Sequence, residues 1–132
     1  MIPDCVVDAK ESRQVWDTIK VVNELDDQGE LGDTIIIALG ANGSFDESMG
    51  QRLLDAIGTE RTVYWITAYG KFLYWQEDVN GMIEKLAEKN ENLNILDWAS
   101  IASEHPEWFY DDGMHLNSEG QTGYADFIAE HI

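Results

Sequence analysis

Asp112 and His115 lie three residues apart in the segment Tyr110–Leu116, on either side of Gly113. A histidine can act as a general base where it reaches the proton it removes, and a neighbouring carboxylate can fix its tautomer and stabilise its protonated form. A bent loop containing glycine lets side chains at this spacing meet. The pair therefore indicates chemistry of the Ser-His-Asp type. The alternative is a surface turn made by Asp112 with a solvated histidine.

Asn42 is a second candidate, in the segment Gly40-Ala41-Asn42-Gly43 that follows a buried strand. Its side-chain amide N–H could donate to a developing oxyanion, and the flanking glycines would let a substrate approach the backbone closely. Asparagine and glycine also favour ordinary turns, so a plain turn is the alternative.

The elements that must position these residues alternate between strand and helix. Apolar runs predict strands over 5–9, 34–39, 62–68 and 93–98. Apolar residues at helical spacing predict helices over 12–28 and 74–89, and Ser44-Phe45-Asp46-Glu47 is typical of a capping box for a helix that reaches Ile57. Asn117 is expected to cap a last helix that buries Tyr124, Phe127 or Ile128. Alternation of this kind predicts an α/β fold with a parallel sheet.

In such sheets the active crevice lies beyond the carboxyl ends of the strands. Ser12 and Arg13 follow the first predicted strand and Asn42 follows the second. Asp112 and His115 follow the last one. We therefore expect these distant residues to converge on one edge of the sheet.

Composition limits the class of protein. The 132 residues suffice for one domain with a core, and 44% hydrophobic with 11% aromatic residues exclude disorder. The formal net charge of −18 disfavours nucleic acid and anionic lipid as partners. Cys5 is the single cysteine, which rules out an internal disulfide, and no signal peptide or membrane-length apolar run is present.

Taken together and in order, three segments resemble the SGNH (GDSL-like) hydrolase family. The closest likeness is to the extracytoplasmic domain fused to bacterial membrane acyltransferases, which include the peptidoglycan O-acetyltransferases. The segments are 7–14, 32–43 and 112–116, and Asp97-Trp98 also fits. The resemblance covers nearly the whole chain and implies a three-layer, flavodoxin-like fold.

The resemblance also implies residue roles. His115 matches the family's catalytic base, Asp112 its triad acid and Asn42 its oxyanion-hole asparagine. Ser12 matches a position often held by glycine, whose backbone N–H is a further oxyanion donor; a serine keeps the N–H but is less free at positive φ. Asp111, where the family often has proline or a small residue, adds a second carboxylate beside Asp112.

The family's nucleophile lies in a Gly-Asp-Ser block at the end of the first strand, and that strand would precede Met1. The similar string Gly32-Asp33-Thr34 opens a strand rather than closing one. We therefore expect residues 1–132 to form a single, N-terminally truncated domain that lacks the nucleophile, with Ser12 or Ser44 as remote substitutes. In strand order 2-1-3-4-5 this deletion leaves a gap of roughly 10 Å. The sheet could close up, another chain could donate a strand, or residues 5–9 could move into the slot.

Two main functions stay open. The chain is part of an acyl ester hydrolase or O-acyltransferase that moves acetyl groups to or from carbohydrate and is inactive alone, or it is a degenerate module for carbohydrate binding or assembly. For the second, an aromatic set could stack on sugars, although packing is its ordinary role: Trp65, Tyr69, Tyr74 and Trp75. A metal site at Asp111, Asp112 and His115 is a weaker idea. The resemblance implies no cofactor, an extracytoplasmic, cell-surface location and a membrane-anchored full-length protein.

Overall fold

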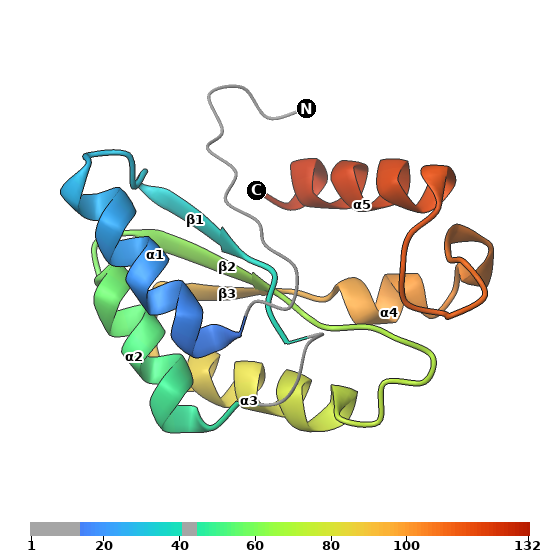
Figure 1. Cartoon of the computed structure of the whole chain (residues 1–132), viewed down its shortest axis with the longest axis horizontal. Coiled ribbons are helices and arrows are strands. Elements are labelled where there is room, and N and C mark those ends of the chain that lie inside the picture. Colours follow the sequence, from blue (N-terminus) through green and yellow to red (C-terminus); the bar gives the residue numbers. More distant parts are fainter. Residues whose placement is uncertain (1–13, 41–44) are drawn as a thin grey trace.

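A parallel three-stranded sheet with helices on both faces forms the described part of the chain, residues 14–40 and 45–132 of the computed structural model (Figure 1). The sheet order is β1-β2-β3, and Thr34 of β1 lies opposite Thr62 of β2. Along the chain the elements are α1 (Val15–Asp27), β1 (Thr34–Ile37), α2 (Glu47–Ile57), β2 (Thr62–Ile66), α3 (Gln76–Lys89), β3 (Leu93–Leu96), α4 (Trp98–Ala102), the 3-10 turn η1 (Pro106–Trp108) and α5 (Ser118–His131).

The predicted α/β class and parallel sheet are therefore confirmed. The described strands also follow the part of the flavodoxin-like order in which sequential strands are neighbours. The predicted strand over residues 5–9 lies outside the described residues, and so do the three ways in which the sheet could accommodate a missing strand.

Strand β2 shows why the sheet is covered on both faces. Val63 and Trp65 are fully buried in one apolar cluster, which contains residues of α1, α2 and α3. Tyr64 and Ile66 alternate with them and belong to a second cluster, which contains residues of α4 and α5. Figure 1 shows α1, α2 and α3 on one side of the sheet and α5 on the other. The result is the predicted three-layer arrangement.

The residues at which the helices begin agree in part with those predicted from the sequence. Asn117 caps α5 as predicted, since its side chain accepts a hydrogen bond from Gly120 N at 3.0 Å. Phe127 is buried on this helix, while Tyr124 and Ile128 are partly buried. The capping-box prediction for α2 was wrong by two residues. Asp46 caps this helix by accepting from Met49 N at 2.8 Å, because Phe45 before it is buried and stacks on Trp65.

The segment after β3 also departs from the prediction. The strand expected over 93–98 ends at Leu96 because the Asp97 carboxylate caps α4. It accepts from the backbone N–H of Ser100 at 3.4 Å and also from the Ser100 hydroxyl at 2.6 Å. Helix α4 and the turn η1 were not predicted from the sequence. They place the Trp108 ring between Trp98 and His105, with ring-centroid distances of 5.8 and 3.8 Å.

Helix α5 then packs tightly against Trp108. A Cβ atom on Gly120 would lie 2.2 Å from the Trp108 carbonyl oxygen, and one on Gly123 would lie 2.7 Å from the Trp108 ring. Only glycine permits this approach. The contact fixes both ends of the segment between Trp108 and α5, which contains Asp112 and His115. Within the described residues, no helix is both long and apolar enough to cross a bilayer.

Candidate active site

The segment Tyr110–Leu116, called the catalytic turn below, is closed by its own backbone. Tyr110 N donates to the His115 carbonyl at 3.0 Å, and Gly113 N donates to the Tyr110 carbonyl at 2.9 Å. Leu116, the last residue of the turn, forms an antiparallel bridge with Phe109, the residue that precedes the turn. Gly113 has a φ of 67°, in the left-handed region that glycine adopts without strain. The turn is therefore a small, internally hydrogen-bonded loop.

Asp112 performs two tasks in this turn with its two oxygens. Oδ1 accepts from the backbone N–H groups of Met114 and His115, at 2.9 and 3.0 Å. Oδ2 lies 2.5 Å from His115 Nδ1. The hydrogen bond from the His115 side chain, followed by the two backbone donors, lowers the pKa of Asp112 to about 2. The carboxylate is therefore ionised at neutral pH.

The ionised carboxylate determines which nitrogen of His115 carries the proton. A carboxylate only accepts, so Nδ1 must hold the hydrogen that it shares with Asp112. This leaves Nε2 of the neutral ring with a free lone pair. The side chain of His115 is 72% exposed, so Nε2 is accessible to another molecule. An accessible imidazole oriented by a carboxylate is the arrangement that a general base requires.

A second loop supports the catalytic turn from outside. Lys71 N, in the loop after β2, donates to the Gly113 carbonyl at 2.9 Å. The two segments are so close that a Cβ atom on Gly113 would lie 2.5 Å from Lys71 Cβ. The loop is itself held by α3, because Asn80 exchanges hydrogen bonds of 2.8 and 2.9 Å with the backbone N–H and carbonyl of Ala68. Sequence patterns gave no sign of this contact.

An apolar pocket of about 200 Å³ lies beside the catalytic turn. Met114 and Leu116, which flank His115, form part of its wall, and Ala38 and Leu39 beyond the end of β1 form another part. The backbone that leads toward Asn42 therefore reaches the pocket next to His115. Tyr124 also lines the pocket, and burial raises the pKa of this phenol to about 12.

Asn42 and Ser12 themselves lie outside the described residues, as does Ser44. The last described residue before Asn42 is Gly40, whose carbonyl accepts a hydrogen bond from the Trp75 indole at 2.9 Å. Of the predicted site residues, the structure therefore describes Asp112 and His115 and places them in contact. The roles given to Asn42 and Ser12 stay predictions.

The four aromatic residues considered as a sugar-stacking surface have different surroundings. Trp65 is fully buried and stacks on Phe45, so packing is its role. Tyr69 packs on Phe109 with ring centroids 5.2 Å apart, and Trp75 is anchored to Gly40. Tyr74 differs, since it is 89% exposed.

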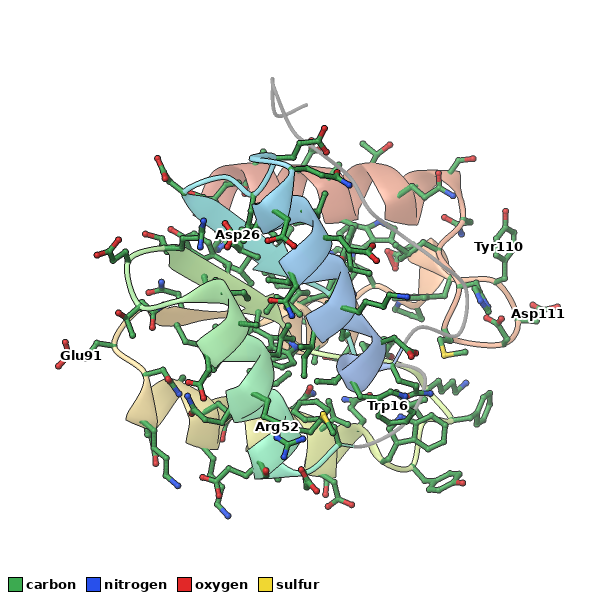
Figure 2. All side chains as sticks on the ribbon, turned by 60° about the vertical axis from the view of Figure 1, so that its left-hand side comes forward. Trp16, Asp26, Arg52, Glu91, Tyr110 and Asp111 are labelled. Carbon is green, nitrogen blue, oxygen red and sulfur yellow. The ribbon has the colours of Figure 1, made fainter. Side chains whose placement is uncertain are left out.

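The described residues give no support to a metal site at Asp111, Asp112 and His115. Over residues 14–40 and 45–132, no group of three or more His, Cys, Asp or Glu side chains is arranged to hold a metal ion. Figure 2 shows Asp111 pointing outward at the tip of the turn, whereas Asp112 is engaged with His115.

A larger cavity of about 440 Å³ lies near the amino ends of the strands, lined by Asp33 and the 57–61 turn. Arg61 in its wall is already bonded to the Gly32 carbonyl at 3.1 Å and to Asp26 at 3.0 Å. This cavity lies at the edge of the sheet away from the catalytic turn and holds no histidine. The chemistry of the residues therefore favours the smaller pocket.

No protein-family model matches the sequence. O-acetyltransferase OatA of Staphylococcus aureus (strain NCTC 8325 / PS 47) is 31% identical over 130 residues, 98% of this chain and 21% of the relative. The putative peptidoglycan O-acetyltransferase YrhL of Bacillus subtilis (strain 168) is 29% identical over 124 residues, 94% of this chain and 19% of the relative. The chain thus spans about a fifth of the length of these curated relatives.

A solved structure has the same fold. The C-terminal catalytic domain of Streptococcus pneumoniae peptidoglycan O-acetyltransferase A (OatA), solved with a methylsulfonyl adduct, superposes with a TM-score of 0.84. The match has 23% sequence identity and covers 98% of this chain and 79% of that one. Nearly the whole chain is thus similar to the C-terminal catalytic domain of peptidoglycan O-acetyltransferases, and the resemblance predicted from its sequence is confirmed.

Proposed function

We propose that this chain is an SGNH-type domain of an acyl ester hydrolase or O-acyltransferase, with His115 as its general acid–base and Asp112 as the residue that orients it. The observation that carries the proposal is the contact of 2.5 Å between Asp112 Oδ2 and His115 Nδ1. It leaves Nε2 accessible, and Met114 and Leu116 on either side of His115 line an apolar pocket into which we place the acyl group. The names of the relatives support acetyl transfer as the reaction.

In the complete site, a serine Oγ attacks the carbonyl carbon of the acyl ester while His115 Nε2 takes the serine proton. The tetrahedral intermediate carries its charge on the former carbonyl oxygen, toward which Asn42 and the Ser12 N–H donate. His115 then gives the proton to the leaving alcohol oxygen, and an acyl-serine remains. Throughout, the Asp112 carboxylate accepts from Nδ1 and stabilises the imidazolium.

The second half of the reaction uses the same groups in reverse. His115 removes a proton from the acceptor hydroxyl, whose oxygen attacks the acyl-serine. Collapse of the intermediate returns the proton to serine and releases the new ester. Water as acceptor makes the domain an esterase, and a carbohydrate hydroxyl makes it an O-acetyltransferase. Peptidoglycan, named for the Bacillus relative, is the carbohydrate that we propose, which would place the domain at the cell surface within a membrane-anchored protein.

The nucleophilic serine is the part of the site that the sequence does not supply at an expected position. We therefore propose that the 132-residue chain is inactive alone. It should hydrolyse p-nitrophenyl acetate no faster than its H115A variant, and a fluorophosphonate should not label it. Stoichiometric labelling would contradict this point and identify a serine within the chain as the nucleophile.

The acid–base assignment is tested by supplying the serine. A chimera carries a family-type strand ending in Gly-Asp-Ser before Met1, and its serine-to-alanine version is the control. We expect the chimera to hydrolyse p-nitrophenyl acetate. H115A should lower its kcat at least about a hundredfold, which is the rate enhancement that a general base usually contributes. A folded chimera whose kcat is unaffected by H115A would refute the proposed role of His115.

A further inference from the structure

Three exposed aromatic side chains belong to the catalytic turn or to the loop that is hydrogen-bonded to it. Among residues 14–40 and 45–132, the large hydrophobic side chains that are exposed are Trp16, Phe72, Tyr74, Tyr110 and Ile132, with exposed fractions of 52, 70, 89, 60 and 42%. Tyr110 belongs to the catalytic turn itself, and Figure 2 shows it projecting from the molecule beside Asp111. Phe72 and Tyr74 belong to the loop after β2. These three residues, Phe72, Tyr74 and Tyr110, are called the aromatic rim below.

The rim is tied to the catalytic turn through the backbone. Lys71, which precedes Phe72, donates its N–H to the Gly113 carbonyl at 2.9 Å. Gly113 in turn donates its N–H to the Tyr110 carbonyl at 2.9 Å. The first of these hydrogen bonds connects the loop of Phe72 and Tyr74 to the turn that holds His115, and the second continues within that turn to Tyr110. A ligand long enough to extend from His115 to that loop would contact the catalytic turn and the loop at the same time.

The loop of Phe72 and Tyr74 is also ordered in advance. Gly70 N donates to Gln76 Oε1 at 3.0 Å, and Leu73 N donates to the Gly70 carbonyl at 3.0 Å. The Tyr74 ring meets Trp75 edge-on, with centroids 4.9 Å apart, and Trp75 is anchored through its indole N–H. Ordering the backbone of this loop beforehand reduces the entropy that a ligand must overcome on binding.

We propose that the aromatic rim is a carbohydrate-binding platform, on which Phe72 and Tyr74 stack against sugar rings next to the sugar that reacts at His115. The inference rests on the proposed function, since it extends that site to a glycan several sugars long. It assigns to two residues a role in glycan binding that is separate from the acid–base chemistry of His115 and Asp112.

The chemistry of the rim favours a sugar over other ligands. The face of an aromatic ring is electron-rich and attracts the weakly positive C–H bonds that one face of a pyranose presents. The formal charge of −18 disfavours anionic membranes and nucleic acid, which need a basic surface. A glycan of N-acetylated hexosamines is uncharged at its ring faces, so this surface does not repel it. Lys71, whose ammonium lies 5.5 Å from the Phe72 ring centroid, supplies a donor for sugar oxygens.

The test is a binding measurement on the 132-residue chain, which needs no nucleophile. Chitopentaose, a soluble pentamer of N-acetylglucosamine, is titrated by calorimetry and by NMR shifts of backbone amides. We expect F72A and Y74A each to weaken binding roughly three- to tenfold, in line with the value of a single aromatic contact. The ring-preserving variants F72Y and Y74F should bind like the wild type. I132A, which removes an exposed apolar side chain outside the rim, is the matched control.

The outcomes separate this inference from the proposed function. Loss of binding in F72A and Y74A, with H115A still binding, supports the platform. Equal affinity of all variants, or no binding of chitopentaose by the wild type, overturns it and leaves the acid–base role of His115 to the chimera assay. Binding to vesicles of phosphatidylglycerol that depends on Phe72 and Tyr74 would also overturn it, because the rim would then be a membrane contact.

Discussion

Gly113→Ala is the substitution that tests most directly how the catalytic turn is held. Alanine at a φ of 67° costs roughly 1–2 kcal/mol, because its Cβ approaches the following carbonyl. In addition, the new Cβ would lie 2.5 Å from Lys71 Cβ, an atom fixed to the backbone that cannot rotate away. Relieving such overpacking typically costs about 1–3 kcal/mol. We therefore expect G113A to lower the free energy of unfolding by roughly 2–5 kcal/mol.

Gly29 provides the matched control for this prediction. Its φ is 72°, but a Cβ placed there would have no atom within 4 Å. G29A should therefore show only the backbone term, roughly 1–2 kcal/mol. The difference between the two variants isolates the contact of Gly113 with Lys71, about 1–3 kcal/mol. With a urea m-value of roughly 1–3 kcal/mol per molar, the unfolding midpoints should differ by about 1 M.

Hydrogen exchange supplies a second measurement on the same pair of variants. The Lys71 amide is hydrogen-bonded to the Gly113 carbonyl, so G113A should remove its protection while G29A should not. The packing that we describe between the turn and its supporting loop would be refuted if the two variants had equal urea midpoints and G113A left the exchange protection of the Lys71 amide unchanged.

Three further predictions concern single side chains. The Asp112 carboxyl should stay ionised down to a pH of about 2 in a ¹³C NMR titration, and H115A should raise its pKa toward the usual value, since the histidine is the main cause of the shift. The stabilising effect of that carboxylate is complete above its ordinary pKa and is lost as the pH falls toward 2. Burial raises the pKa of Tyr124 to about 12, so the phenol of the unfolded chain ionises at lower pH than that of the folded protein. The free energy of unfolding of the wild type should therefore fall between pH 10 and 12. In urea melts over this range, Y124F should lose up to about 3 kcal/mol less than the wild type. N80A should destabilise the protein by roughly 2–4 kcal/mol in the same melts, because it leaves the Ala68 N–H and carbonyl without their partners.

The periodicity of the sequence predicted the architecture because it reports burial directly. The apolar runs over 34–39 and 62–68 reflect a sheet that is covered on both faces, and strands β1 and β2 were found within them. Element ends were less accurate, because they depend on tertiary contacts. Asp46 replaces the expected Ser44 as a cap once Phe45 is stacked on Trp65. Helix α4 is too short to produce a periodic signal.

The candidate site was predictable where its parts are local in sequence. Asp112 and His115 are three residues apart, so a bent loop was enough to bring them together. The contact between Lys71 and Gly113 joins residues far apart in the chain, and neither residue type indicates it. The exposure of Tyr74 and the burial of Trp65 also depend on packing, since both are aromatic residues in an aromatic-rich stretch.

The close packing of α5 against Trp108 has a consequence for how the site assembles. Gly120 and Gly123 lie inside α5, and each lowers the intrinsic stability of a helix by about 1 kcal/mol relative to alanine. The stability of α5 therefore depends on its packing against Trp108. The turn that carries His115 connects Trp108 to this helix. We expect α5 and the catalytic turn to form late during folding and to unfold locally in mild denaturant. His115 would then lose its contact with Asp112 before the sheet unfolds.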